Sequence, residues 1–251
     1  MRQKIIAGNW KMNKDIDEAI ELVMNLEQYR DEMPKDVKVI LAPPSLYLAN
    51  LTMIENPFFT LAAQNCSHHD YGAFTGEISP AMLHAMHIDY CIVGHSERRQ
   101  YYHETDELIA RKIDACLRNH VNPIFCCGES LEQRNTKKHF VTVLLQVEEA
   151  LYHLKPEEMK HVIIAYEPVW AIGTGVTASS NEVEEMHGFI RDSLITHFGE
   201  QLAAEISILY GGSVNAMNSD EIFACPNVDG GLVGGASLKG KEFATIIKSF
   251  V

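Results

Sequence analysis

The chain has 251 residues, 46% of them hydrophobic, and a formal net charge of −13 at pH 7. We therefore expect neither a nucleic-acid binder nor a protein of anionic membrane surfaces, and no apolar run is long enough to span a bilayer. The length suits one domain, residues 1–251, and α/β barrels of this size are routinely single domains.

The N-terminus and the cysteines bear on the cellular compartment. Residues 1–4 precede only a brief apolar run, so we expect no signal peptide. The six cysteines show no C-x-x-C spacing, and several lie in apolar runs where a reduced thiol packs as a small hydrophobic side chain. We expect a cytoplasmic protein with reduced thiols.

Short apolar runs recur along the chain and predict strands. They cover residues 5–7, 37–42, 58–63, 90–93, 123–127, 162–166, 206–210 and 231–233. Helix-like segments lie between them. The first has an apolar stripe at Ile16, Ala19, Ile20, Val23 and Leu26, and the last is predicted over 242–251. Eight strand–helix units in succession predict a closed parallel (β/α)8 barrel, the TIM-barrel class, rather than an open sheet.

Helix starts and one long loop complete this pattern. Asp15-x-x-Glu18 and Ser179-x-x-Glu182 resemble capping boxes, and Ser79 precedes a proline at a first helical position. Residues Gln64 to Glu77 show neither helical nor strand periodicity. A loop of this length in a compact domain is usually functional or a partner contact.

Polar side chains follow several predicted strands directly. Asn9 and Lys11 follow the first strand, His95 the fourth and Glu167 the sixth. In a barrel, the C-terminal ends of all strands open into one mouth, so we expect these side chains to meet there. Ser96 and Glu97 predict a helix start beside His95, able to lower its pKa.

The segment after Glu167 predicts a base under a lid. Pro168 ends the strand, and Trp170 and Ile172 are costly to expose in a loop unless they pack over something. Gly173 and Gly175 permit the backbone angles of a moving flap or a phosphate contact. Glycine turns also follow the last two strands, at 211–212 and 234–235, and offer N–H groups to a phosphate.

Two rival functions are considered. Residues 173–178 fit G-x-G-x-x-A, as in a nicotinamide-dependent oxidoreductase. That reading requires an acidic residue at the end of the following strand, which instead ends in Gly211-Gly212. A non-catalytic sugar-phosphate-binding barrel is the second rival. The joint presence of Glu167, His95 and Lys11 argues against it, since a binder needs no base at a carbon acid.

Four long motifs resemble the triosephosphate isomerase family. They are Gly8-Asn9-Trp10-Lys11, Gly94-His95-Ser96-Glu97-Arg98-Arg99, Ala165-Tyr166-Glu167-Pro168 and Leu232-Val233-Gly234-Gly235-Ala236, and the likeness covers essentially the whole chain. It implies interconversion of dihydroxyacetone phosphate and D-glyceraldehyde 3-phosphate through an enediolate, as in glycolysis and gluconeogenesis. It implies no cofactor, and the contiguous His68-His69-Asp70 does not have the spacing of a metal site.

The resemblance also implies a role for each site residue. Glu167 is the base and acid that moves the proton, and a neutral His95 donates hydrogen bonds to the substrate oxygens. Lys11 and Asn9 hold the substrate's oxygen and charge, and Glu97 supports Lys11 and His95. The phosphate is bound by Gly173, Ser213, Gly234 and Gly235.

A homodimer is the assembly that the resemblance implies. The loop from Gln64 to Glu77 would interdigitate with the partner, with Thr75 at its tip near the other subunit's Asn9 and Lys11. The chain departs from the family pattern at three positions: His103 and His120 replace glycines, and Val176 replaces a lysine at the far end of the lid.

Overall fold

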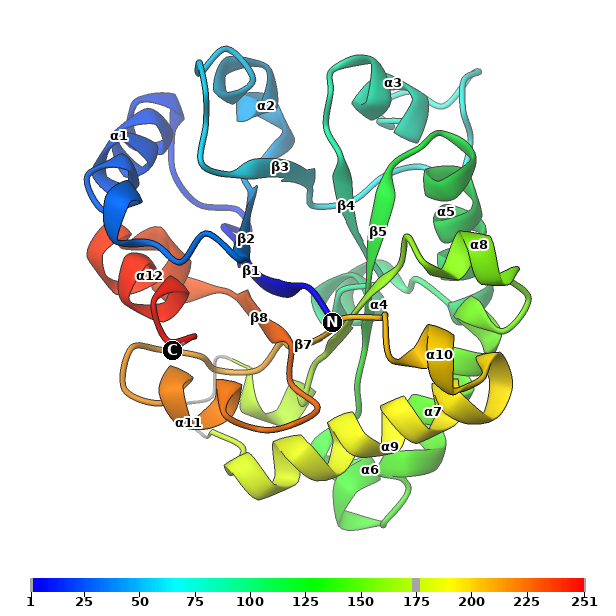
Figure 1. The fold of residues 1–251 in the computed structure, drawn as a ribbon. Coiled ribbons are helices and arrows are strands. Elements are labelled where there is room, and N and C mark those ends of the chain that lie inside the picture. The colour runs from blue at the N-terminus through cyan, green and yellow to red at the C-terminus, as the bar shows by residue number, and fades with distance from the viewer. Residues whose placement is uncertain (1, 173–176, 251) are drawn as a thin grey trace.

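The computed structural model describes residues 2–172 and 177–250. Its centre is a closed barrel of eight parallel strands that pair in chain order, surrounded by helices (Figure 1), and this confirms the predicted (β/α)8 barrel. The strands are β1 (Lys4–Asn9), β2 (Val37–Ala42), β3 (Thr60–Ala63), β4 (Tyr90–Val93), β5 (Asn122–Cys127), β6 (Ile163–Tyr166), β7 (Ile208–Tyr210) and β8 (Gly230–Val233). All eight predicted strands are present, and their ends shift by at most two residues.

Helices fill the connections. They are α1 (Ile16–Glu27), α2 (Ser45–Leu51), α3 (Pro80–Ala85), α4 (Ser96–Tyr102), α5 (Asp106–Arg118), α6 (Leu131–Asn135), α7 (His139–Leu151), α8 (Pro156–Met159), α9 (Ser180–Phe198), α10 (Glu200–Ala203), α11 (Ser219–Phe223) and α12 (Gly240–Ile247). Three short 3₁₀ turns join them: η1 (Arg30–Glu32), η2 (Val169–Ala171) and η3 (Gly235–Leu238). The last helix starts two residues before its predicted position and ends at Ile247.

Strand alternation produces two apolar cores. In β1, Ile5 and Ala7 point into the barrel, where they meet inward side chains of the other strands, whereas Ile6 packs outward under the helices. The same alternation in β4 turns Ile92 inward and Cys91 outward. Because successive strand side chains face opposite sides, each continuous apolar run serves both cores.

The helix starts agree with the sequence prediction, but one buried position does not. Asp15 and Ser179 form capping boxes, and the Ser79 side chain accepts the N–H of Met82. In α1, Ile20 was predicted to be buried, yet it is 38% exposed, and Leu22 is buried instead. The buried face of α1 therefore includes Leu22, and Ile20 lies outside it.

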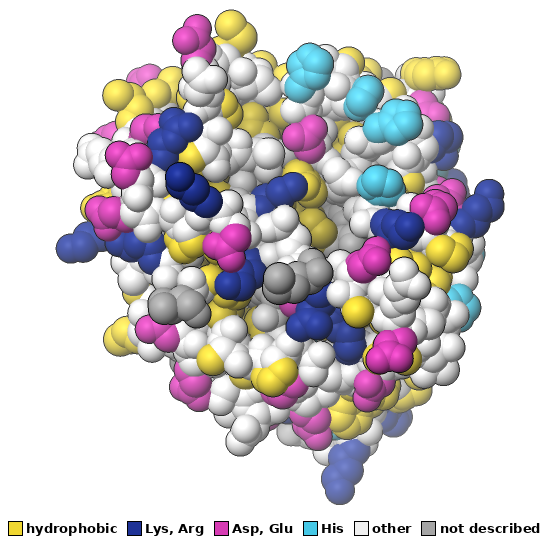
Figure 2. Space-filling view, viewed as in Figure 1, with side chains coloured by type: hydrophobic (Ala, Val, Ile, Leu, Met, Phe, Trp, Pro, Cys, Tyr) yellow, Lys and Arg dark blue, Asp and Glu magenta, His cyan; other side chains and the backbone are white. Residues whose placement is uncertain are grey.

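The surface shows mixed charge. Figure 2, viewed as in Figure 1, shows acidic and basic side chains interspersed, with histidines gathered on the side of α3 and α5. None of the helices described is long and apolar enough to cross a membrane. His103 and His120 both have left-handed backbones, with φ of 55° and 58°, as expected at positions where glycine is more usual.

Barrel closure depends on a glycine at the start of β8. Gly230 has φ of +142°, and a Cβ there would lie 1.8 Å from the carbonyl oxygen of Ile5, the residue it pairs with in β1. Substitution Gly230→Ala should therefore lower the free energy of unfolding by about 3 kcal/mol, since neither backbone can move without breaking the β1–β8 ladder. Urea unfolding at one fixed protein concentration measures this.

Gly188→Ala in α9 is the matched control. A Cβ there would meet only the Asn227 side chain, at 3.6 Å. Helix propensity should then raise stability by about 0.5–1 kcal/mol. Equal effects of the two substitutions would contradict the proposed clash.

Candidate active site

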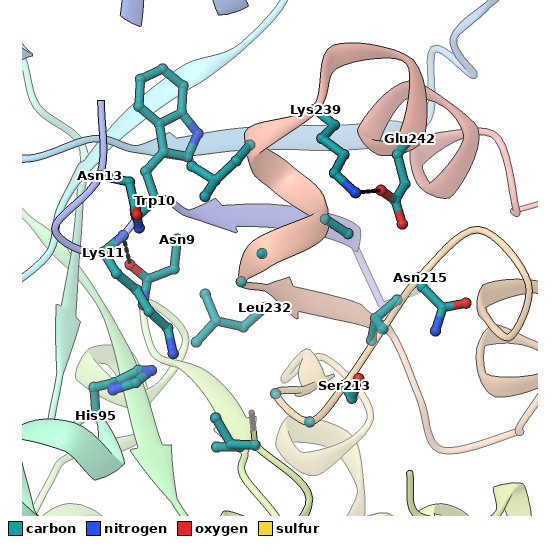
Figure 3. A pocket seen from close by; sticks show the side chains of 18 residues that line it. Asn9, Trp10, Lys11, Asn13, His95, Ser213, Asn215, Leu232, Lys239 and Glu242 are labelled. Carbon is teal, nitrogen blue, oxygen red and sulfur yellow. Dashed lines mark hydrogen bonds and ion pairs between the residues drawn. The ribbon is translucent and has the colours of Figure 1, made fainter. Parts of the chain in front are cut away.

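Three of the predicted mouth residues, Asn9, Lys11 and His95, line one cavity of about 350 Å³. Asn9, Lys11, His95, Ser213, Gly234 and Gly235 all lie on its wall. In Figure 3 the side chains of Asn9, Lys11 and His95 occupy one side of the cavity, and Ser213 and Asn215 lie on the other. The structure thus brings together residues from both ends of the chain, because the strands that carry them end at the same rim.

Lys11 is held by its backbone as well as by its ammonium group. Its φ is +51°, an uncommon conformation for a residue with a Cβ. Asn9 Oδ1 accepts the Lys11 N–H at 3.0 Å, and the Gln64 side chain donates to the Lys11 carbonyl at 2.9 Å. The ammonium group lies 2.6 Å from Glu97 Oε1. These bonds fix the position of one positive charge in a strongly acidic chain.

His95 is positioned by the turn between β4 and α4. Gly94 has φ of +76°, and a Cβ there would come within 2.9 Å of Ile109, so glycine is required at this turn. Arg99 donates to the carbonyls of Gly94 and Cys126 and so ties the turn to β5. The predicted helix start is present, since His95 caps α4 by accepting the Glu97 N–H at Nδ1, at 3.2 Å.

Glu167 is buried beside His95 and is not on the cavity wall. It is 1% exposed, its Oε1 lies 3.0 Å from His95 Nε2, and its Oε2 accepts the Ser96 N–H at 2.8 Å. Burial raises the pKa of Glu167, but His95 and the Ser96 N–H together lower it by more, so the pKa lies below its usual value. The carboxylate is therefore ionised at neutral pH, as a base must be.

The lowered pKa predicted for His95 is not found in this arrangement. Burial lowers the pKa of His95, but the adjacent Glu167 carboxylate raises it by more, and the net shift is upward. The sequence indicated the helix start correctly but gave no sign that Glu167 would rest against the imidazole. The Glu97 N–H at Nδ1 opposes protonation of that nitrogen and favours the proton on Nε2.

A histidine titration separates these two influences. In Glu167→Gln, the pKa of His95 should fall below that of the parent, because the charge that raises it is removed while burial remains. With a substrate-like phosphate ligand bound, His95 should be neutral at pH 7, with its proton on Nε2. Nitrogen-15 NMR reports both the charge and the tautomer. Identical titration in the two proteins, or an imidazolium in the complex at pH 7, would contradict this account.

Two glycine turns also line the cavity. Gly211 and Gly212 follow β7, and Gly234 and Gly235 follow β8. A Cβ on Gly234 would lie 3.6 Å from Lys11 Cε, so this turn faces the ammonium-bearing side chain. Lys239, which the sequence analysis did not select, also lines the cavity and forms an ion pair with Glu242 at 3.2 Å.

A buried glutamate beside the lid was also missed. Glu129 is fully buried just beyond β5 and accepts hydrogen bonds at Oε1 from Tyr166 at 3.0 Å and from Trp170 at 2.9 Å. Its carbonyl accepts the Val169 N–H, and Arg134 stacks over the Trp170 ring. The available signal was a polar residue past a strand end, the same signal that identified Glu167. Glu129 anchors the near end of the lid to the barrel.

Three residues of the predicted lid lie outside the part of the chain that the structure describes. They are Gly173, a predicted phosphate contact, Gly175, and Val176 at the far end of the lid, and all fall between residues 172 and 177. The described part of the lid ends at Ile172, which is on the cavity wall. Glu97 does not line the cavity, but it forms an ion pair with Lys11, which does.

A (β/α)8 barrel with a carboxylate, an imidazole, an ammonium group and two glycine turns at its C-terminal mouth defines a barrel enzyme for a small anionic substrate. Residues 4–250 match the family model described as triosephosphate isomerase. Proteins named triosephosphate isomerase are 48% identical in Cytophaga hutchinsonii and 46% identical in Porphyromonas gingivalis, each over the full length of both chains. A third, from Chloroherpeton thalassium, is 48% identical over 99% of each chain. The chain belongs to the triosephosphate isomerase family.

Proposed function

We propose that Glu167, His95 and Lys11 perform the isomerisation in this chain, an enzyme that interconverts dihydroxyacetone phosphate and D-glyceraldehyde 3-phosphate. Glu167 takes a proton from the carbon beside the carbonyl and returns it to the neighbouring carbon. His95 donates from Nε2 to the oxygens of the enediolate, and Lys11 and Asn9 stabilise its negative charge. Glu97 keeps the Lys11 ammonium in place. The comparisons give no support to a nicotinamide-dependent oxidoreductase.

Glu167 must turn before it can act. Its carboxylate rests on the Ser96 N–H and beside His95, and it is nearly inaccessible there. A Cβ on Gly211 would come within 2.9 Å of Glu167 Cγ, so the glycine leaves room for the side chain at this point. We infer that substrate draws the carboxylate away from Ser96 into the cavity. Once the carboxylate has moved away from His95, the Nε2–H group of His95 is free to bind the substrate.

The phosphate binds at the glycine turns. Ser213, Gly234 and Gly235 line the cavity, and Gly235 has no heavy atom within 4 Å of the position of an added Cβ. Backbone N–H groups can therefore approach a phosphate closely without steric hindrance. Gly173 would contribute from the lid. This placement orients the reacting carbons toward Glu167 and His95.

The main support for this proposal is that Glu167 lies 3.0 Å from His95, which lines the same cavity as Lys11. A coupled assay for the two triose phosphates, on protein dialysed against a chelator and with no isomerase cofactor added, tests it. We expect turnover in both directions. Activity that appears only after a metal ion or a nicotinamide cofactor is added to the isomerase step would overturn it.

We further infer a homodimer that forms through the loop from Gln64 to Glu77. At its tip Tyr71 is 82% exposed and Phe74 is 42% exposed, while His69 stacks on the Phe74 ring at 3.8 Å. An ordered loop that presents aromatic side chains to solvent is suited to a protein partner. At its base, the Gln64 side chain donates a hydrogen bond to the Lys11 carbonyl, so the loop contacts the active site directly.

A cavity of about 310 Å³ is available to receive such a loop. Its wall is formed by Ser45, Gln64, Asn65, Cys66, Gly76, Glu77, Ile78 and Arg98. In a two-fold dimer, the partner subunit's Thr75 would enter this region and hold the segment that carries Asn9 and Lys11. Each site would then be complete in one chain but supported by the other.

Thr75→Arg tests this assembly. A charged side chain at the loop tip is introduced twice in a two-fold interface, so the dimer should dissociate and activity should fall with it, most strongly at low protein concentration. Sedimentation and assay over the same dilution series measure both. Glu157→Arg, a charge change on the exposed surface of α8, is the control and should alter neither. A parent monomer with full activity would refute the dimer requirement.

Residues 1–251 are also inferred to act as one domain, supported by a barrel whose first and last strands pair with each other. A cytoplasmic location is proposed because the six cysteines form no disulfide among the described residues and because the substrate class belongs to central carbon metabolism.

A further inference from the structure

Three cysteines that are distant in sequence meet between the barrel and the helices. Cys66 follows β3, Cys91 lies on β4 and Cys116 lies on α5, and the three sulfur atoms are within 4.8 Å of one another. The Sγ atoms of Cys66 and Cys116 are 3.4 Å apart. The three side chains are at most 1% exposed, and none takes part in the proposed chemistry. Their separation in sequence explains why the cysteine spacing indicated no metal site.

The spacing of the sulfurs suits one small three-coordinate ion. With metal–thiolate bonds of about 2.3 Å, a planar arrangement of three ligands separates the sulfurs by about 4 Å, and a pyramidal arrangement brings them closer. The Cys66 and Cys116 sulfurs are 3.4 Å apart, and no pair among the three exceeds 4.8 Å. Small side-chain rotations are therefore sufficient to close all three sulfurs around an ion.

The number of ligands argues against the commoner thiolate metals. Among the described residues the group contains three sulfur atoms and no histidine or carboxylate. A structural zinc site is almost always completed by a fourth protein ligand. Ions that are satisfied by three sulfurs fit this group better.

The net charge of the complex further restricts which ion can occupy the three-cysteine group. Three thiolates around a monovalent ion leave a net charge of −2, and around a divalent ion −1, whereas a trivalent ion leaves none. An uncompensated charge is costly in a pocket that is as buried as this one. Lys112, the nearby cation, is already engaged by Glu104 at 2.6 Å and by Asn65 at 2.7 Å. A neutral tris-thiolate complex is therefore the most favourable occupant.

We propose that Cys66, Cys91 and Cys116 form a three-coordinate binding site for a trivalent thiophilic ion of the arsenite type. With arsenous acid, three As–O bonds break and three As–S bonds form. Each thiol proton leaves with a hydroxide as water, and arsenic remains trivalent throughout. Cys66 also lies on the wall of the 310 Å³ cavity beside the loop from Gln64 to Glu77, so the ion would enter through this cavity when the partner's loop is not seated in it.

The bound ion would add a link between three elements that are already held by packing and by contacts such as that of Lys112 with Asn65. It would tie the base of the loop to β4 and to α5, so the folded state should be stabilised in proportion to its occupancy. Thiols of the unfolded chain also bind such ions, and that binding acts in the opposite direction. The direction of the shift in Tm therefore distinguishes a preformed site from adventitious chelation.

Sodium arsenite is the probe for the test, applied to the full-length protein kept reduced with a thiol-free reductant. Native mass spectrometry should show one arsenic per chain with the loss of three protons, and X-ray absorption should show three sulfurs around arsenic. The Tm of the parent should rise. Cys225→Ser, which removes a cysteine outside the cluster, is the matched control and should behave as the parent does.

Cys91→Ala and Cys116→Ala should each lose the three-sulfur signal and the rise in Tm. Two variants are used because one of them could fail to fold, and isomerase activity without arsenite reports which are folded. Failure of the parent to bind arsenic, retention of three-sulfur binding by either folded variant, or a fall in the parent's Tm would overturn the proposal. A rise in Tm with zinc chloride but not with arsenite would also overturn the assignment to a trivalent ion.

Discussion

Replacing Glu167 by aspartate should slow the isomerisation on the order of 10²-fold while the fold is retained. The shorter side chain withdraws the carboxylate by about one ångström from the carbon acid, and misplacement on this scale has a cost of that size. Glu167→Gln, which keeps the shape and loses the base, should cost up to about 10⁴-fold. In both variants kcat should fall much more than KM rises, because the interaction that is lost belongs to the transition state.

Steady-state kinetics in both directions measures this effect, with circular dichroism to confirm folding. Glu157→Gln, which alters a carboxylate on the exposed surface, is the control and should leave kcat unchanged. The glutamine in Glu167→Gln can still accept the Ser96 N–H through its carbonyl oxygen, so the position of the side chain should be kept while the base is lost. Parent-like turnover in Glu167→Gln would remove Glu167 from the catalytic role.

Lys11→Met should lower kcat/KM by about 10²–10³-fold, the usual effect of removing one group that stabilises a developing negative charge. Unlike the Glu167 variants, it should also raise KM, because the positive charge attracts the substrate anion in the ground state too. The effect is expected to be large because the chain carries a net charge of −13 and the cavity has few cations. Methionine is unbranched, as lysine is, and should tolerate the φ of +51° comparably.

Lys239→Met is the matched comparison. This lysine lines the same cavity, but its side chain is 74% exposed and is paired with Glu242. Loss of a solvent-screened charge should change kcat/KM by less than about tenfold. If Lys239→Met and Lys11→Met had equal effects, bulk attraction of the anion rather than placement of Lys11 would explain the result.

The sequence by itself determined the class of fold. Eight apolar runs separated by helix-forming segments are typical of parallel strands buried on both faces, and eight such units in succession favour the closed barrel over an open sheet. The capping boxes at Asp15 and Ser179 were also readable, because they depend on residues only three positions apart. The strand-end rule placed Asn9, Lys11 and His95 at one mouth for the same reason: parallel strands end at one rim.

Only the tertiary structure decided how these groups touch. Glu167 rests against His95 and Ser96, and this contact raises the pKa of the imidazole that the helix start alone would lower. Glu129 can hold Trp170 only because β5 and β6 pair side by side in the barrel, and the sequence does not show the resulting contact.

The burial of Leu22 in place of Ile20 likewise depends on how α1 is placed against the rest of the fold. The meeting of Cys66, Cys91 and Cys116 depends on a loop, a strand and a helix that come together only in the folded chain. Local patterns specify elements and their order, since both depend on neighbours in the chain. Contacts between side chains depend on the relative placement of elements, which no local pattern contains.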